Sequence, residues 1–543
     1  ATFSSLELNE NSPSTAVQIG DPITQKRVLD FLMEARDLGL YSSVTDNGAG
    51  GLSSSVGEMS TFTGGATIDL SLAPVKYPGL KPFELMISES QERMTVAVPP
   101  KNVSDFLSLA KRRGVSATDI GEFNDSGRLK VFYGEQKVAD LDLEFVHESL
   151  PPMQLKAKWE GPVARKSWIL RDNRKDIPKI LDQKFYHEAL LKLLSSPNIA
   201  SKEPWVRKYD HEVQAATHIK PFNGIKTDGP SDCGSIWLHP HGGEKDNAVN
   251  VACGMNPRMS LYDTYLMAQF AVDEAVRNVV VSGGDIDKCC LLDNFCWPDP
   301  VASEKNKDGE YKMAQLVRAC HGLFDICNYF GTPLVSGKDS MKNDFRGKNQ
   351  IGTDLTISIL PTLLVTSMSK SNVNFTVTSS FKEAGDLIYI LGKESSGLSA
   401  SEFAELYKVE EKLPQIDLSV NKNLYKTYLK ALENNLICSG HDLSDGGLLV
   451  SIFESSMGGR LGCSISINQE NPIDYLFNEG PGRFCVSVKL ENKEKFEKHF
   501  SNVPFEFLGT VERDQNLKIK NKNSLVLDTS MSDLIDAWKG GLK

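Results

Sequence analysis

The chain carries two copies of one sequence pattern, and this internal repeat constrains its fold more than any other feature. "TDNGAGGL" (45–52) matches "HDLSDGGL" (441–448), with the leading Asp and the closing Gly-Gly-Leu aligned. Further along, "MISESQERMTVAV" (86–98) matches "LFNEGPGRFCVSV" (476–488) in the same order. Ahead of each Asp lies a helical stretch that ends in a short apolar strand. Self-similarity over this length indicates a duplicated domain.

A different domain separates the two copies. If the repeated type is written B and the other A, the sequence predicts B–A–B, whereas a simple duplication predicts A–B–A–B. We therefore expect an N-terminal A domain to be missing from this chain. The strand and helix patterns predict an α/β (α+β) fold. Its expected parts are a tail or linker (1–16), a first B domain (17–165), a helical connector (166–215), an A domain (216–370) and a second B domain (371–543).

Composition argues against several functional classes. The formal net charge of −11 comes without a long basic cluster, which disfavours nucleic acid binding because phosphate neutralisation needs grouped Lys and Arg. The 10 cysteines form no CxxC pair, which argues against a zinc site or disulfide framework and favours a reducing compartment. The longest apolar runs are too short to span a bilayer, and the polar N-terminal stretch lacks the features of a signal peptide. We therefore expect a cytoplasmic protein without membrane or nucleic acid partners.

Each copy places an Asp at the start of a glycine-rich turn. In the first copy Asp46 follows an apolar strand, and the glycines after it let backbone N–H groups approach a phosphate. The carboxylate could hold a magnesium ion that bridges phosphate oxygens. An ordinary Asp-Gly turn that needs a positive φ explains the same residues, and it is the commoner case for a single motif.

The turn before the next strand differs between the copies. Ser90 and Gln91 in the first copy supply uncharged donors and acceptors, which suits a ligand-binding turn and an ordinary polar turn equally well. The second copy has Gly480 and Pro481 at these positions, and neither offers a side-chain hydrogen bond. This asymmetry predicts that the first copy binds substrate and that the second supports the fold.

The A domain carries polar residues of the types that bind metal–phosphate groups. Glu274 and Asn278 lie four residues apart on one face of a predicted helix, where a solvated or capping pair is about equally expected. Asp232 and Asp293 lie beside apolar segments, where α/β proteins often place ligands. "PLVSGKDS" (333–340) resembles a phosphate loop but lacks the spacing G-x-x-x-x-G-K-[ST], so a Walker-type loop is rejected.

No arrangement for nucleophilic catalysis stands out. His441 lies beside the second Asp turn, and Thr45 occupies its place in the first copy. A lone His by a turn is more often structural than catalytic, and no Ser-His-Asp or Cys-His set can be assembled around it.

Together the motifs resemble one enzyme family. They are "VQIGDP", "TDNGAGGLSSSVGEMS", "LMISESQERM", "DEAVRN", "LLDNFCWPDP", "PLVSGKDS" and "HDLSDGGL", and they extend over nearly the whole chain. In this combination and order they resemble the synthetase subunits of phosphoribosylformylglycinamidine synthase, in the aminoimidazole ribonucleotide synthetase-like superfamily. Such subunits have an A–B–A–B architecture, which accounts for the B–A–B order and its missing first domain.

The resemblance implies an ATP-dependent ligase that converts formylglycinamide ribonucleotide and ammonia into formylglycinamidine ribonucleotide through an iminophosphate, with ATP and Mg2+ as cofactors. The residues implied to bind substrate are Gln18, Glu89, Ser90, Gln91 and Ser340. Those implied to contact ATP are Asp293, Gly337 and Lys338. The first implied magnesium ligand is Asp46. At an auxiliary site for a structural Mg–ADP, the implied ligands are Asp232, Glu274, Asn278 and Asp339.

Two implied parts of the enzyme lie outside this chain. The family's catalytic residues belong to the first A domain, so no catalytic residue is assigned here. The chain also has no room for a glutaminase domain, so a separate glutaminase subunit would supply ammonia, with a small accessory subunit as a further partner. Two alternatives stay open. One is another ATP-dependent synthetase of the superfamily, against which the duplication argues, and the other is a non-catalytic nucleotide-binding scaffold.

Overall fold

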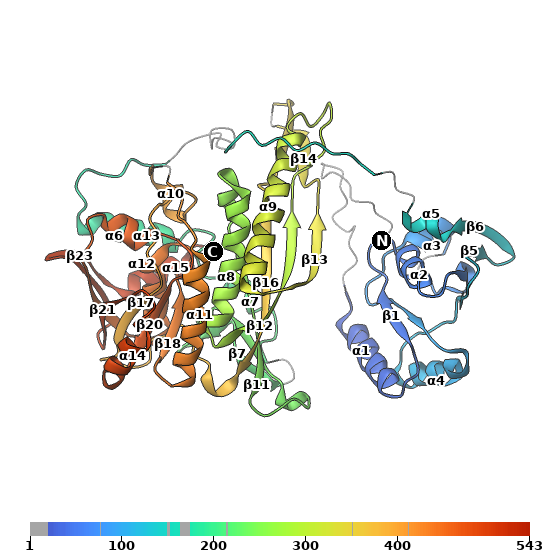
Figure 1. Ribbon diagram of the computed structural model, residues 1–543, viewed down its shortest axis with the longest axis horizontal. Coiled ribbons are helices and arrows are strands. Elements are labelled where there is room, and N and C mark those ends of the chain that lie inside the picture. Colours follow the sequence, from blue (N-terminus) through green and yellow to red (C-terminus); the bar gives the residue numbers. More distant parts are fainter. Residues whose placement is uncertain are drawn as a thin grey trace. The chain divides into compact units, whose positions relative to one another are not determined.

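The computed structural model describes residues 20–75, 78–148, 152–162, 174–212, 215–349, 351–410 and 412–542. The chain divides into two compact units (Figure 1). The first unit covers the chain up to Gln154 together with Phe345–Thr356, and the second holds Leu155–Asp344 and Ile357–Lys543. Within the described ranges, none of the helices combines the length and the apolar character needed to cross a membrane.

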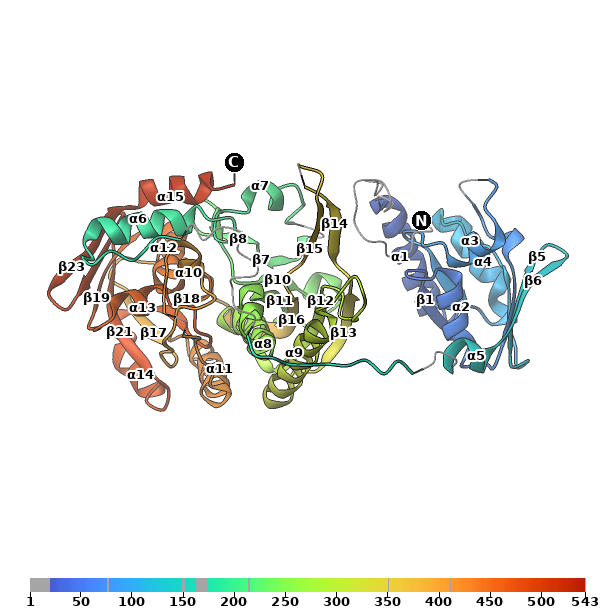
Figure 2. The ribbon, with the colours of Figure 1, turned by 90° about the horizontal axis from the view of Figure 1, so that it is seen from above.

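The first unit contains the first copy of the repeat. Its elements are α1 (Pro22–Asp37), β1 (Ser43–Asp46), α2 (Leu52–Ser60), β2 (Ala66–Asp69), α3 (Pro82–Ile87), β3 (Met94–Ala97), α4 (Val103–Arg113), β4 (Gly121–Phe123), β5 (Arg128–Tyr133), β6 (Gln136–Asp142) and α5 (Leu143–Glu148). β1 pairs with β3, and a four-stranded sheet has the order β4-β2-β5-β6. Its strands β5 and β6 lie next to each other in Figure 2. Its buried apolar residues form two clusters, one around α2, β2 and β5 and one where α1 meets α4.

The second B domain repeats these elements in the same order. They are α11 (Leu418–Glu433), β18 (Ser439–Asp442), α12 (Gly447–Gly459), β19 (Gly462–Ile467), α13 (Pro472–Phe477), β20 (Phe484–Val488), α14 (Lys493–His499), β21 (Phe505–Glu512), β22 (Asn516–Asn521), β23 (Ser524–Ser530) and α15 (Met531–Gly540). β17 (Leu387–Leu391) precedes them and joins a seven-stranded sheet of order β18-β20-β17-β21-β19-β22-β23. A counterpart of β17 in the first copy would precede α1, and residues 1–19 lie outside the described part of the chain.

The two copies share their strand register, which confirms the duplication at the level of single residues. Asp46 pairs with Met94 in the first copy, and Asp442 pairs with Phe484 in the second. The aligned motifs predict this correspondence, because they place Asp46 on Asp442 and Met94 on Phe484. Each Asp therefore stands at the end of its strand, directly before the glycine-rich turn.

The A domain forms a six-stranded sheet of order β13-β12-β16-β11-β10-β7. Its strands are β7 (Thr217–Ile219), β10 (Gly234–Trp237), β11 (Asn247–Met255), β12 (Gly284–Cys296), β13 (Leu334–Ser340) and β16 (Thr362–Asn372). Helices α8 (Thr264–Val281) and α9 (Gly309–Phe330) pack side by side against this sheet (Figure 1). A small hairpin of β8 (Phe222–Asn223) with β9 (Gly229–Pro230) belongs to the same unit, whereas most of the hairpin of β14 (Asp344–Lys348) with β15 (Asp354–Ser358) belongs to the first unit.

Helix α8 is buried on nearly all sides because it packs against both the six-stranded sheet and α11 of the second B domain (Figure 2). Asp263 caps its N-terminus by accepting a hydrogen bond from the Tyr265 N–H at 2.9 Å, which satisfies one of the unpaired donors of the first turn. One apolar cluster runs from α8 through α11 into β17. The A domain and the second B domain thus share a core.

The seven-stranded sheet is covered on both faces. Alternate residues of β17 belong to the cluster shared with α8 (Leu387, Tyr389, Leu391) and to a second cluster (Ile388, Ile390). This alternation follows from the period-two geometry of a strand. Helices α12 and α15 contribute to the second cluster, so the strands at the centre of this sheet are fully enclosed.

Part of the segment expected as a connector, 166–215, belongs to this second cluster. It contains α6 (Gln183–Leu194) and α7 (Glu203–Val206). Asp182 caps α6 by accepting a hydrogen bond from the Phe185 N–H at 2.9 Å. Helix α6 packs against α15 and β23. The side chains that it buries there are Phe185, Tyr186, Ala189, Leu190, Leu193 and Leu194.

Candidate functional site

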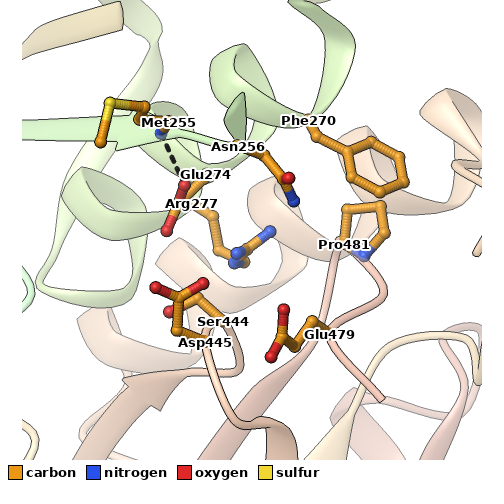
Figure 3. Close-up of a pocket in the computed structure, with 9 residues that line it drawn as sticks. All are labelled: Met255, Asn256, Phe270, Glu274, Arg277, Ser444, Asp445, Glu479 and Pro481. Atoms are coloured by element: carbon orange, nitrogen blue, oxygen red, sulfur yellow. Dashed lines mark hydrogen bonds between the residues drawn. The ribbon is translucent and has the colours of Figure 1, made fainter. Parts of the chain in front are cut away.

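A pocket opens where the A domain meets the second B domain (Figure 3). The end of β11 and one face of α8 form one side, and the turns after β18 and before β20 form the other. The residues lining it are Met255, Asn256, Phe270, Glu274, Arg277, Ser444, Asp445, Glu479 and Pro481. Both turns belong to the repeated motifs, so the pocket lies at the second copy of the region that the sequence singles out.

Three carboxyl groups line this pocket, from Glu274, Asp445 and Glu479 (Figure 3). Burial raises the pKa of Glu274 to about 8, and burial together with the Glu402 carboxylate raises the pKa of Asp445 to about 7. Burial, and next the neighbouring Asp445, raises the pKa of Glu479 well above its ordinary value. Because a nearby cation would favour the charged form of each group, the pocket is suited to a positive ion.

Glu274 is held against the end of β11. The Met255 N–H donates a hydrogen bond to its Oε2 at 2.8 Å (Figure 3). A Cβ added at Gly254 would lie 2.3 Å from the Ala271 carbonyl oxygen. Only glycine therefore lets β11 approach α8 this closely.

Two nearby oxygen atoms indicate whether this region fits a metal ion. The Asn278 Oδ1 and the Asp232 Oδ2 are buried and have no hydrogen-bond partner among the described residues. The amide nitrogen of Asn278 donates to the Cys253 carbonyl at 3.2 Å, which orients its oxygen. A buried oxygen without a partner is costly unless a ligand completes it. Carboxylate and amide oxygens are preferred ligands of magnesium, so these residues fit that ion.

Asp442 lies beside Asp232, and His441 lies between acidic groups. Asp232, His441 and Asp442 bring potential ligand atoms within 4.8 Å of one another. The His441 Nδ1 lies 2.6 Å from the Asp232 Oδ1, and its Nε2 lies 2.9 Å from the Glu454 Oε2. Burial alone would lower the pKa of His441, but the Asp232 and Glu454 carboxylates raise it well above its ordinary value. The Arg277 Nη2 lies 3.3 Å from the Asp442 Oδ2 on the other side.

A buried polar network fixes the walls of the pocket relative to each other. The Asp273 carboxylate of α8 is fully buried. It accepts hydrogen bonds at 2.5 to 3.1 Å from the side chains of Arg277, Asn421 and Tyr425 and from the Gly482 N–H. Because these donors come from α8, α11 and the turn before β20, the network joins the A domain to the second B domain.

The structure does not bring Asp339 close to Asp232. Asp339 lies on β13 opposite Phe295, and β12, β16 and β11 separate this strand from β10, which Asp232 precedes. Its charge instead affects Asp293, whose pKa is raised by burial and further by Asp339. The stretch "SGKDS" forms β13 itself rather than a loop after a strand, which holds Asp339 in the sheet. Asp442 brings a potential ligand atom close to Asp232 instead.

The residues expected to contact ATP are neighbours across β12 and β13. Asp293 pairs with Gly337, and Lys338 pairs with Asn294. A Cβ added at Gly337 would lie 2.8 Å from the Asp293 Oδ1, so glycine leaves space for the carboxylate. Ser340 ends the same strand.

In the first unit, the expected binding residues lie in two turns. Asp46 ends β1 with an exposed side chain that accepts a hydrogen bond from the Gly48 N–H at 2.8 Å. In the turn before β3, Glu89 and Gln91 are exposed and Ser90 is half-buried. Gln18 lies outside the described residues.

The matching turn of the second copy is occupied by contacts within the fold. Glu479, Gly480 and Pro481 are buried. The Glu479 Oε1 accepts hydrogen bonds from the Glu402 N–H at 2.9 Å and the Gly446 N–H at 2.7 Å. The two turns thus differ in burial as well as in side-chain chemistry.

Sequence reasoning does not find Glu454, the position of Asp442 beside Asp232, or the pairing of His441 with two carboxylates. Asp232 and Asp442 are 210 residues apart and meet only through the packing of two domains. The one available signal is the repeat, which marks Asp442 as the counterpart of a suspected magnesium ligand.

Comparison with known proteins gives the family. A model described as AIR synthase related protein, C-terminal domain, matches residues 1–134 and 383–522, and one described as AIR synthase related protein, N-terminal domain, matches residues 230–360. The chain is 33% identical over 552 residues to phosphoribosylformylglycinamidine synthase subunit PurL of Alkaliphilus metalliredigens (strain QYMF), covering 100% of this chain and 70% of that protein. The chain belongs to this family. The matched order of domain types confirms B–A–B and the predicted fold class.

Solved structures show the same fold. PurLQS from Thermotoga maritima is 19% identical with a TM-score of 0.62, covering 93% of this chain and 70% of that chain. T. maritima PurL complexed with FGAR is 19% identical with a TM-score of 0.61, and the match covers 93% of this chain and 67% of that chain. Membership of the PurL family makes the chain an ATP-dependent ligase of purine biosynthesis, which excludes the scaffold reading.

Proposed function

We propose that this PurL-family chain contributes the first-copy substrate turn and a second-copy nucleotide support site to formylglycinamidine ribonucleotide synthesis. In that reaction ATP phosphorylates the amide oxygen of formylglycinamide ribonucleotide, giving an iminophosphate and ADP. Ammonia then adds at the same carbon, and phosphate leaves with the oxygen. The 33% identity to a PurL subunit carries this proposal. A T. maritima relative has been solved complexed with FGAR and with ATP, which agrees with the proposed substrates.

In this proposal the first copy binds the substrate. Glu89, Ser90 and Gln91 line an open turn, whereas the second copy buries the matching residues. Exposed polar side chains at a turn can offer donors and acceptors to a ligand, which supports the assignment. Gln18 and Ser340 are the further substrate-binding residues that the family motifs imply.

The proposal places nucleotide-binding residues in the A domain and one magnesium ligand in the first copy of the repeat. A second nucleotide site lies where the A domain meets the second copy. Asp293, Gly337 and Lys338 would contact ATP, and Asp46 would hold magnesium. At the auxiliary site Asp232, Glu274, Asn278 and Asp442 would hold the magnesium of a bound ADP. The buried oxygens of Asp232 and Asn278, which have no hydrogen-bond partner within the described part of the chain, support this set. Bound magnesium supplies charge neutralisation between the carboxylates and a phosphate.

The proposed partners include a further A-type domain. By the shared order of elements, Leu29 on α1 corresponds to Tyr425 on α11, which packs against α8. Tyr425 is fully buried, whereas Leu29 is 50% exposed. We therefore assign the α1 face to an A-type domain like the one on which α11 packs. A separate glutaminase and a small accessory subunit are the other proposed partners, and the structure titled PurLQS agrees with such an assembly.

The proposed compartment is the cytoplasm. All 10 cysteines of the chain carry free thiols, which suits a reducing environment.

The reaction is tested by product analysis with ammonium chloride as the nitrogen source. We expect the purified chain alone to release no phosphate from ATP in the presence of formylglycinamide ribonucleotide, because the acid–base groups are assigned to the proposed further A-type domain. Adding that domain as a separate polypeptide should restore formation of the amidine, ADP and phosphate in equal amounts. Substrate-dependent phosphate release by the chain alone would contradict this division of roles.

The auxiliary site is tested by extracting nucleotide from the purified chain. We expect ADP in the supernatant after denaturation, or a rise in melting temperature when Mg–ADP is added, because a ligand bound only by the folded state stabilises it. A nucleotide-free protein whose melting temperature ignores Mg–ADP would contradict the assignment.

A further inference from the structure

We infer that His441 is a positioning residue, which holds Asp232 so that the second oxygen of this carboxylate faces the metal of the auxiliary site. This inference rests on the proposed function, because that proposal assigns Asp232 to magnesium. It concerns a different residue and adds a role that the family motifs do not imply.

His441 is not itself a ligand in this arrangement. Its Nδ1 and Nε2 each lie within hydrogen-bond distance of a carboxylate oxygen, at 2.6 Å from Asp232 and 2.9 Å from Glu454. A ring nitrogen that forms a hydrogen bond to a carboxyl group is directed at that group. Both ring nitrogens of His441 are engaged in this way, so neither is directed at a metal ion.

The two carboxylate oxygens of Asp232 lie in different environments. The Oδ1 accepts hydrogen bonds from His441 and, at 3.4 Å, from the Asp442 N–H. The Oδ2 is buried without a partner among the described residues, and the whole side chain is only 1% exposed. Because the hydrogen bond to His441 fixes Oδ1, it also fixes the position of Oδ2. The lone pairs of Oδ2 are then available to a metal ion. Groups that orient a metal ligand in this way commonly change metal affinity by about 10- to 100-fold when they are removed.

Acidic groups surround the ring. Besides Asp232 and Glu454, the Asp442 Oδ1 lies 3.7 Å from the His441 Nδ1. The ring is thus in contact with three carboxyl groups, from Asp232, Glu454 and Asp442.

The first copy has no histidine at the position that corresponds to His441. Aligned positions place Thr45 on His441 and Glu58 on Glu454. Glu58 is exposed and accepts a hydrogen bond from the Ser54 hydroxyl at 2.9 Å. The carboxylate is thus present in both copies, and the imidazole that links it to a second carboxylate is present only in the copy with the auxiliary site.

The test is a calorimetric titration of the purified chain with Mn2+ as the probe. Asp232→Asn first identifies the binding component that belongs to this site, since Asp46 could bind a second ion. His441→Thr, which introduces the residue of the first copy, should weaken that component by about 10- to 100-fold. His441→Asn should weaken it less, because its amide can still donate to Asp232 from near the position of Nδ1. Thr45→Ala serves as the matched control in the first copy and should leave the component unchanged.

The outcomes separate this inference from the proposed function. If the unsubstituted chain has no component that Asp232→Asn removes, the auxiliary site itself is refuted. If that component exists and a folded His441→Thr variant binds Mn2+ as tightly as the unsubstituted chain, or more tightly, the positioning role is overturned. The melting temperature of each variant, measured without metal, shows whether the variant is folded. Where His441→Thr does not fold, His441→Gln takes its place with the same expectation, because its longer side chain cannot present the donor at Nδ1.

Discussion

The side chain of Asp417 makes the stability of helix α11 depend on pH. Its carboxylate accepts hydrogen bonds from the Lys393 ammonium at 2.9 Å and, at the start of α11, from the Val420 N–H at 3.2 Å. Lys393, and next Ser419 and the Val420 N–H, lower the pKa of Asp417 from 3.8 to about 2. Because the folded pKa lies below the unfolded one, Asp417 adds stability that is fully present above about pH 4 and is lost as the pH falls toward 2.

We predict that Asp417→Ala lowers the free energy of unfolding around α11 by about 1 kcal/mol at pH 7, the usual cost of losing a helix cap. Asp417→Asn should cost less, because Asn is also a good cap. Thermal unfolding or amide hydrogen exchange of α11 at several pH values measures this. The difference between Asp417→Ala and the unsubstituted chain should shrink between pH 4 and pH 2, and a difference that grows on acidification would refute the explanation.

At the same scale, the sequence predicts individual binding groups better than it predicts their neighbours. It places Glu274 and Asn278 on one helix face, and both lie on that face of α8. The sequence places Asp339 after a strand, whereas local pairing with β12 makes it part of β13. Asp442 is missed as a neighbour of Asp232 because side chains 210 residues apart are brought together only by tertiary packing.

At the scale of elements, the repeat extends to a close contact between strands. Gly121 of β4 pairs with Ile68, and Gly509 of β21 pairs with Ile465. The φ angles of these glycines are 153° and 157°. An added Cβ would lie 2.1 Å from the Thr67 carbonyl oxygen in the first copy and 2.0 Å from the corresponding Ser464 oxygen in the second. Each sheet therefore requires glycine at this position.

We predict that Gly121→Ala and Gly509→Ala are destabilising to a similar degree, by about 1–3 kcal/mol each, because backbone atoms of the paired strand must move to admit the methyl group. Gly121→Ala should lower the unfolding transition of the first unit, and Gly509→Ala that of the second. Gly57→Ala and Gly540→Ala are matched controls, since their added Cβ atoms meet nothing closer than 4.0 Å. A clear cost at only one of the two strand glycines would contradict their structural equivalence.

The order of elements within each copy could be predicted from the repeat, but the domain to which a helix attaches could not. The apolar positions of α6 indicate a buried helix without saying what covers it. In the structure it covers one face of the second B domain rather than linking two domains. Such an assignment depends on contacts with α15 and β23, which lie more than three hundred residues away in the sequence.

At the scale of the whole molecule, the two B domains have diverged in what they expose. The second buries its turn, packs α11 on the A domain and surrounds His441 with carboxylates. The first keeps Gln91 exposed and leaves Leu29 half-exposed on α1. This divergence is what the proposed division between a substrate-binding half and a nucleotide-holding half requires.

The most direct test of this division is the affinity for formylglycinamide ribonucleotide, measured by calorimetry for the unsubstituted protein and two matched variants, each assembled with the N-terminal A domain. Gln91→Ala should weaken binding by about 1–3 kcal/mol, roughly 5- to 150-fold, because a hydrogen bond to the buried ligand is lost. Pro481→Ala, at the matching position of the second copy, should bind as tightly as the unsubstituted protein. Equal losses at both positions, or a loss at Pro481 alone, would show that the substrate turn belongs to the other half.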